Sequence, residues 1–113
     1  HIDGTARIAE ITREGNFWTF RFEADRSLLG QMVLKGSVAV DGISLTIAEL
    51  EDRGFSVEVI PQTFEHTTLG NAKTGDIVNI EIDMIVKAVR RNLEQMMGGR
   101  EKMTIEKLRE LGF

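Results

Sequence analysis

Apolar and polar residues alternate along much of the chain up to residue 83, and turn residues interrupt the alternation at regular intervals. A period of two places successive side chains on opposite faces, as in a β-strand with one buried face. Six strands are predicted, over 5–12, 17–22, 37–40, 43–50, 55–60 and 76–83. Short strands at this spacing are typical of a small closed antiparallel barrel or a sandwich.

Two short helical stretches interrupt the predicted strands. The segment "RSLLGQM" is Leu-rich and predicts one helical turn that Gly30 closes. A second helix is predicted over 63–69, where the Thr63 hydroxyl could cap its first turn and Gly70 could end it. Both stretches fit as connections within a β-barrel.

The hydrophobic period changes from two to that of a helix at Ile85. This period lasts up to the "GG" pair at 98–99, and another amphipathic helix is predicted over 104–111. We therefore divide the chain into a β-barrel, 1–84, and a C-terminal helical segment, 85–113. A closed barrel buries its own core, so the apolar stripes of these helices need another partner. Association with another copy or domain is one interpretation, and packing back over a barrel mouth is the other.

The predicted strand 43–50, which follows a tight Asp-Gly turn, has two dissimilar faces. Its core face carries Ile43, Leu45 and Ile47, whereas Ser44 and Thr46 lie on a face of small residues. A hydroxyl-bearing outer face often simply faces water. The alternative is that small side chains leave room for a planar ring, whose polar edge binds the hydroxyls and backbone groups.

A second candidate stretch is "VIPQTFEHTTLG", residues 59–70. Pro61 stops the preceding strand, and the first N–H groups of the predicted helix then face whatever lies above the strand end. A plain strand-to-helix corner with a capping threonine explains the same pattern. The motif therefore allows a ligand but does not require one.

Composition and charge exclude several classes of function. The net charge of −4 and a pI near 5.2 give no basic field for a nucleic-acid backbone, so an oligonucleotide-binding barrel is disfavoured. The chain has no cysteine, which excludes disulfides and a Cys/His zinc site and fits a cytosolic protein. No apolar run approaches the ~20 residues of a membrane span.

Single residues add little by pattern alone. The chain starts at "HIDGTARI" without a methionine, and we expect it to be a piece of a longer protein. His1 could carry a proton, although a terminal histidine can equally be disordered. Lys35 precedes a glycine in a turn and would normally face solvent, and Asp83 is placed to cap the helix that follows it.

Four motifs in register resemble the C-terminal barrel of the riboflavin synthase family: "HIDGTARI", "LKGSVAVDGISLT", "VIPQTFEHTTLG" and "GDIVNIEID". The closing "TIEKLRELGF" is similar to the C-terminal tail of that family. The resemblance implies a six-stranded antiparallel Greek-key β-barrel followed by one or two helices. It also implies transfer of a four-carbon unit between two molecules of 6,7-dimethyl-8-ribityllumazine. The products would be riboflavin and 5-amino-6-ribitylaminopyrimidinedione, with no metal or organic cofactor.

The resemblance also implies partners and site residues. Each barrel would bind one lumazine, and the active site would form where this barrel faces the N-terminal barrel of another chain, in a homotrimer assembled through the C-terminal helices. The residues matching catalytic positions are His1, Thr46 and Asp83. Those matching substrate-binding positions are Ile2, Lys35, Ser44, Leu45, Thr46, Val59, Ile60, Pro61, Gln62 and Thr63.

Two departures from the family bear on activity. The N-terminal barrel and the glycine expected before His1 are absent from this sequence. We therefore expect this chain alone to bind lumazine without turning it over. A non-catalytic lumazine- or flavin-binding protein with the same barrel is the alternative function.

Overall fold

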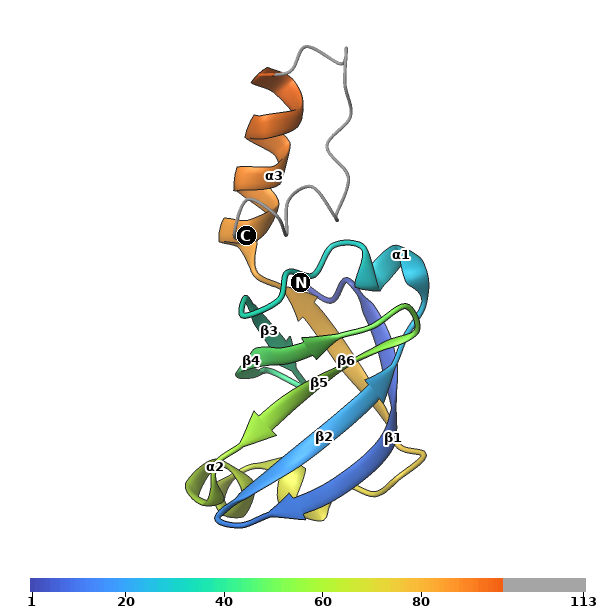
Figure 1. Cartoon of the computed structure of the whole chain (residues 1–113), viewed down its shortest axis with the longest axis vertical. Helices are drawn as coiled ribbons and strands as arrows, with labels where there is room; N and C mark the ends of the chain where they lie inside the picture. The colour runs from blue at the N-terminus through green and yellow to red at the C-terminus, as the bar shows by residue number, and fades with distance from the viewer. Residues whose placement is uncertain (97–113) are drawn as a thin grey trace.

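Six strands form a closed antiparallel barrel in the computed structural model, which describes residues 1–96 (Figure 1). Each predicted strand is confirmed, with ends displaced by at most two residues. The strands are β1 (Gly4–Glu14), β2 (Phe17–Glu23), β3 (Ser37–Val40), β4 (Ile43–Leu50), β5 (Gly54–Val59) and β6 (Ile77–Ile82). The "GG" pair and the helix predicted over 104–111 lie outside the described residues.

The strand order around the barrel is β1-β2-β5-β4-β3-β6, and β6 pairs back with β1. Strands β3, β4 and β5 follow one another as neighbours, and β6 returns to lie beside β3. A fourth strand that returns beside the first of three consecutive strands defines a Greek key. The expected fold class is confirmed.

The barrel interior is apolar because alternate side chains of each strand point inward. Phe22 stacks on Phe55 with ring centroids 4.9 Å apart, and Phe20 lies next to Phe22 at 6.2 Å. Helix α1 (Arg26–Leu29) contributes two buried leucines near one end of the barrel (Figure 1). Aromatic and aliphatic packing therefore accounts for the closed core.

The other end of the barrel is covered by α2 (Pro61–His66) and the 3-10 helix η1 (Thr68–Asn71) (Figure 1). Trp18 of β2 stacks on Phe64 of α2, with ring centroids 4.2 Å apart and planes within 9° of parallel. Leu69 of η1 is buried in the core cluster, against which Trp18 and Phe64 pack. Stacked rings and a buried leucine therefore help to close this end of the barrel.

The helix predicted over 63–69 begins and ends earlier than expected, at Pro61 and His66, so Thr63 does not cap it and Gly70 does not end it. Pro61 occupies the first helical position, where its fixed φ and missing N–H are no disadvantage. Ile60 is the N-cap residue and makes no side-chain capping bond. The Thr63 carbonyl instead accepts a 2.6 Å hydrogen bond from the Thr67 hydroxyl, and that hydroxyl in turn accepts from Leu69 N–H to cap η1.

The β3–β4 hairpin closes through the Asp-Gly dipeptide that the sequence indicated. Asp41 has φ +48° and Gly42 has φ +81°, the left-handed pair that a two-residue turn of this hand requires. Asp41 also accepts a 2.7 Å hydrogen bond from Asn79 N–H through Oδ1. The turn fixes which side chains of β4 point outward.

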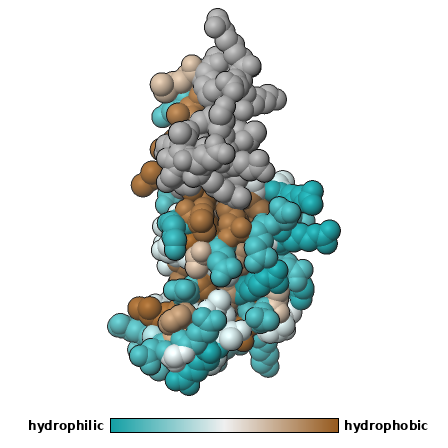
Figure 2. All heavy atoms as spheres, viewed as in Figure 1, coloured by the Kyte–Doolittle hydropathy of each residue, from teal (hydrophilic) through white to brown (hydrophobic). Residues whose placement is uncertain are grey.

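Helix α3 (Met84–Met96) leaves the barrel after β6 and projects beyond its end (Figure 1). Met84, Ile85 and Met96 are 81%, 73% and 82% exposed, and Figure 2 shows apolar residues gathered where the helix leaves the barrel. Helix α3 does not fold back over the barrel mouth. Among residues 1–96, no helix is long and apolar enough to cross a membrane.

Candidate functional site

The two faces of β4 differ as the alternation predicted. Leu45 and Ile47 are 8% and 1% exposed and belong to the core, whereas the Ser44 and Thr46 side chains are exposed. Leu45 could therefore meet a ligand on the outer surface only through its backbone. The two hydroxyls share the outer face, as a ring-binding surface would require.

A face of small side chains extends from β4 to β3. Ser37 pairs with Thr46 and Ala39 pairs with Ser44. We call these four residues the small-residue face. A hollow of about 300 Å³ lies over part of it, where β6 continues into α3. The lining residues are Ser37, Val38, Ala39, Ser44, Glu81, Ile82, Asp83 and Met84.

The small-residue face lies where the pairing between β4 and β5 stops. In the described part of the chain the β4–β5 register ends at Ile47 and Val57. Residues 44–46 pair with β3, and residues 58–59 pair with β2. The facing backbone edges of β4 and β5 beyond this point are not joined by ladder pairs. A planar ligand with a polar edge can use such backbone groups without displacing a strand.

The substrate-binding candidates at the end of β5 are mostly on the surface. Val59 is fully buried, whereas Ile60 is 58% exposed. Pro61 and Gln62 are exposed in the first turn of α2, and Thr63 is half-buried. Apart from Val59, whose side chain belongs to the core, these residues are accessible to a ligand.

Lys35 is held beside β4 by its own backbone. Its φ is +69°, and its N–H donates a 2.9 Å hydrogen bond to the Ile47 carbonyl. The side chain is exposed and starts next to the strand that carries Thr46. A cationic group is therefore available near the small-residue face.

Asp83 connects the barrel to α3. Its Oδ1 accepts a 2.8 Å hydrogen bond from Ile85 N–H, and its carbonyl accepts a 3.1 Å bond from Lys87 N–H. The capping role that the sequence indicated is confirmed. Asp83 also borders the same hollow as Ser44, so one carboxylate serves the helix and faces the candidate site.

His1 lies on the other side of the end of β6. Its exposed side chain borders a second hollow of about 390 Å³. The lining residues of this hollow are His1, Glu81, Ile82, Met84, Lys87, Ala88 and Arg91. The two hollows share Glu81, Ile82 and Met84. The structure thus brings Ser44, Asp83 and His1 around one strand end. Thr46, which pairs with Ser37, lines neither hollow, and Ile2, next to His1 in the sequence, is 53% exposed.

Comparison with known proteins identifies this kind of barrel. Residues 1–83 match the family model described as the lumazine binding domain. The chain belongs to the lumazine-binding domain family.

Several relatives of this chain are riboflavin synthases. It is 38% identical to riboflavin synthase of Actinobacillus pleuropneumoniae and 40% identical to that of Bacillus subtilis (strain 168), in both cases over 100% of this chain and 54% of the relative. It is 42% identical to the Escherichia coli (strain K12) enzyme over 89% of this chain and 48% of the relative. The chain therefore spans about half the length of these relatives.

Solved structures confirm the fold independently. LumP in complex with riboflavin matches with a TM-score of 0.69 at 23% identity, over 74% of this chain and 45% of that one. LumP in complex with 6,7-dimethyl-8-(1'-D-ribityl) lumazine matches with the same TM-score and identity, over 74% of this chain and 47% of that one. At this identity the likeness establishes a shared barrel.

Sequence reasoning missed one residue of this lumazine-binding domain, Asp3. The side chain is 10% exposed; its Oδ2 accepts a 2.7 Å hydrogen bond from Ile82 N–H, and its Oδ1 contacts Lys87 Nζ. Burial alone would raise the pKa of Asp3, but the hydrogen bonds from Lys87 and Ile82 and the nearby positive charge lower it overall. No local pattern in the sequence links residue 3 to residue 87.

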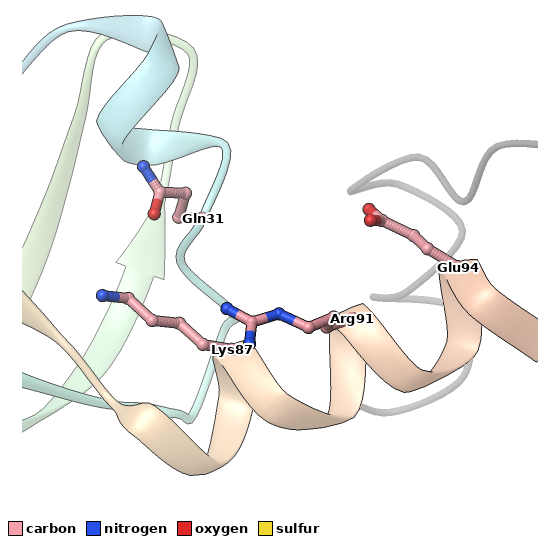
Figure 3. A pocket seen from close by; sticks show the side chains of 4 residues that line it. All are labelled: Gln31, Lys87, Arg91 and Glu94. Atoms are coloured by element: carbon pink, nitrogen blue, oxygen red, sulfur yellow. The ribbon is translucent and has the colours of Figure 1, made fainter.

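Lys87 lies between the barrel and a further hollow along α3. Figure 3 shows Lys87, Arg91 and Glu94 along one side of the helix, opposite Gln31 from the loop after α1. Lys87 and Arg91 also line the hollow that contains His1. Within residues 1–96, no three His, Asp or Glu side chains gather closely enough to hold a metal ion.

Proposed function

We propose that this chain binds one molecule of 6,7-dimethyl-8-ribityllumazine and supplies half of a riboflavin synthase active site. The observation that carries the proposal is the small-residue face beside the open end of the β4–β5 register, in a member of the lumazine-binding domain family. The match to riboflavin synthases at about 40% identity, over the whole of this chain and about half of each relative, supports the enzyme over a carrier.

The small-residue face suits a flat, polar heterocycle. Ala39 and Ser44 offer a surface without bulky side chains, on which the ring lies flat. The Ser44 and Thr46 hydroxyls, together with backbone groups of β4 and residues 59–63, bind the polar edge of the ring. This arrangement needs no metal or organic cofactor.

The reaction joins two such rings through transfer of a four-carbon unit, giving riboflavin and 5-amino-6-ribitylaminopyrimidinedione. The methyl group at position 7 of the lumazine is unusually acidic, so a nearby base or bound water suffices to remove its proton. His1 is the candidate for proton handling, and Thr46 and Asp83 complete the catalytic set. Holding two rings face to face contributes ~7–11 kcal/mol in well-oriented reactions.

The second ring comes from a second barrel. We infer that this chain is the C-terminal barrel and that it faces the N-terminal barrel of another chain in a cytoplasmic homotrimer. Residues 85–113 would form the assembling segment. The exposed apolar side chains of Met84, Ile85 and Met96 support a partner for α3.

A fluorescence titration with 6,7-dimethyl-8-ribityllumazine tests the ligand. We expect saturable binding of about one ligand per chain, lost in the Ser44→Ala/Thr46→Ala variant because the ring edge loses its hydroxyl partners. The matched control is Thr5→Ala/Thr12→Ala on β1, which lies three strands from β4 around the barrel. Binding that survives Ser44→Ala/Thr46→Ala unchanged contradicts this site.

Turnover is tested by fusing this chain to a second barrel. The chain alone should produce no riboflavin, whereas the chain fused behind the N-terminal barrel of the Actinobacillus pleuropneumoniae enzyme should. If the chain is active only when fused to the C-terminal barrel of that enzyme, then this chain is the N-terminal barrel rather than the C-terminal one.

A non-catalytic flavin- or lumazine-binding protein is the second candidate. The observation that favours it is the shared fold of LumP, whose structures hold riboflavin, flavin mononucleotide or a lumazine. Ligand binding without turnover in both fusions supports this alternative.

A further inference from the structure

Asp3 follows His1 by two residues and contacts two parts of the molecule that are distant from it in sequence, the end of β6 and the first turn of α3. We propose that Asp3 is a positioning residue that holds His1 and Asp83 in fixed relation to each other. The inference rests on the proposed function, because it names a positioning residue for the same site.

The first set of contacts joins Asp3 to β6. Asp3 N–H donates a 2.8 Å hydrogen bond to the Ile80 carbonyl, and Oδ2 accepts a 2.7 Å bond from Ile82 N–H. Asp3 is two residues from His1, and Ile82 directly precedes Asp83. These bonds therefore restrain the backbone on either side of the strand end that the two hollows share.

The second contact joins Asp3 to α3. Asp3 Oδ1 pairs with Lys87 Nζ, and Lys87 N–H donates to the Asp83 carbonyl. The Asp3 and Lys87 side chains are 10% and 29% exposed. A pair so shielded from water is less screened than a surface ion pair, so it restrains the start of the helix that Asp83 caps.

These restraints affect catalysis because His1 and Asp83 border adjacent hollows on either side of Glu81. Catalytic groups lose effect when they move by about 1 Å. Asp3 lines neither the hollow beside Ser44 nor the hollow beside His1. The small-residue face depends instead on the pairing of β3 with β4. Loss of Asp3 should therefore impair turnover and spare ligand binding.

Two variants separate the contacts of Asp3. Asp3→Asn retains an oxygen that can accept from Ile82 N–H but removes the charge that pairs with Lys87. Lys87→Gln removes the same ion pair from the other side. In the active fusion we expect each to lower kcat by about 10-fold or more. The double variant should be no worse than either single variant, because both remove one interaction.

The control variants exclude general damage. Lys87→Arg keeps the positive charge that pairs with Asp3 and should therefore retain most of kcat. Glu23→Gln breaks the 2.6 Å ion pair between Arg7 and Glu23 on β1 and β2, away from the rim, and should leave kcat unchanged. KM and the lumazine Kd should change by less than about twofold in the Asp3 and Lys87 variants, because the interaction lost does not bind substrate. Unchanged kcat in Asp3→Asn, or a loss confined to KM, overturns the inference.

A distance measurement tests the positioning without turnover. The chain has no cysteine, so Glu58→Cys and Gln95→Cys place two spin labels on exposed sites of β5 and α3. We expect a narrow distance distribution by pulsed electron paramagnetic resonance in this doubly labelled chain, and a broad one when Asp3→Asn or Lys87→Gln is added. Equal widths overturn the positional claim. Absence of turnover in the parent fusion contradicts the proposed function and the catalytic part of this inference, while the distances still decide the positional part.

Discussion

The barrel interior and the rim where β6 passes into α3 are held together in opposite ways. The interior consists of apolar side chains such as Phe22, Phe55 and Ile47, which are buried. The hydrophobic effect that buries them does not depend on the orientation of particular groups. The rim depends on a few directional contacts, chiefly those of Asp3 with Ile82 and Lys87. The interior gives the barrel its stability, and the rim arranges the groups that we propose to act on a ligand.

This difference implies that function can be changed at the outer surface with little cost in stability. Outward residues such as Ser44 and Thr46 lie on the same strand as core residues, only one position away. Adjacent substitutions on β4 can therefore test the two roles separately.

The largest effect is expected inside the barrel. Ile47→Ala should lower the free energy of unfolding by about 2–5 kcal/mol, because truncating a side chain that is only 1% exposed leaves a cavity in the core. Urea unfolding followed by the fluorescence of Trp18, the single tryptophan, measures it. Thr46→Val on the outer face is the matched control and should change stability by less than about 1 kcal/mol. Equal losses would contradict the division of β4 into two faces.

The next effect is expected on ligand binding. Ala39→Phe puts a ring on the small-residue face and should raise the Kd for 6,7-dimethyl-8-ribityllumazine at least ~10-fold, about 1.4 kcal/mol. Unfolding should change little, because the added side chain points outward from β3. Thr5→Phe on β1 is the control that adds the same ring elsewhere on the barrel. Unchanged affinity in Ala39→Phe would show that the ring lies on another surface.

A smaller effect is expected at the turn between β3 and β4. Gly42→Ala should cost about 1 kcal/mol, because a side chain is strained at φ +81° even where nothing crowds it. Asp41→Asn is the control, since asparagine tolerates a positive φ and keeps an oxygen for Asn79 N–H. Urea unfolding measures both variants. A neutral Gly42→Ala would mean that the turn does not fix the hairpin register.

The sequence predicted the interior well because local alternation directly encodes which face of a strand is buried. It also predicted the turn at Asp41–Gly42, whose backbone conformation depends on residue type. The start of α2 was misplaced because Pro61 was interpreted as a strand terminator only, although proline also favours the first helical position.

The rim could not be predicted in the same way. Asp3, Ile82 and Lys87 meet only after β1 has paired with β6 and α3 has started. The candidate site residues came from a family resemblance, and the structure adds that Ser44, Asp83 and His1 surround one strand end. Long-range polar contacts have no period in the sequence, so the fold must be known before they can be found.

The smallest predicted effect is the acid sensitivity that Asp3 confers on the rim. The pKa of Asp3 is lowered from its ordinary value of 3.8, because hydrogen bonds from Lys87 and Ile82 and the nearby positive charge outweigh the burial that would raise it. Its ionised form therefore stabilises the folded state above pH 3.8, and this contribution is lost as the pH falls below 3.8 through the folded-state pKa.

The pH dependence of unfolding measures this contribution. Asp3→Asn should be less stable than the unsubstituted chain at pH 7, and the difference should shrink as the pH falls below 3.8, because only the carboxylate can protonate. Urea midpoints at matched pH values give the two curves. A difference between them that stays constant from pH 7 to the acid limit would mean that Asp3 contributes through packing rather than through its charge, and the rim would then resemble the interior more closely than its contacts indicate.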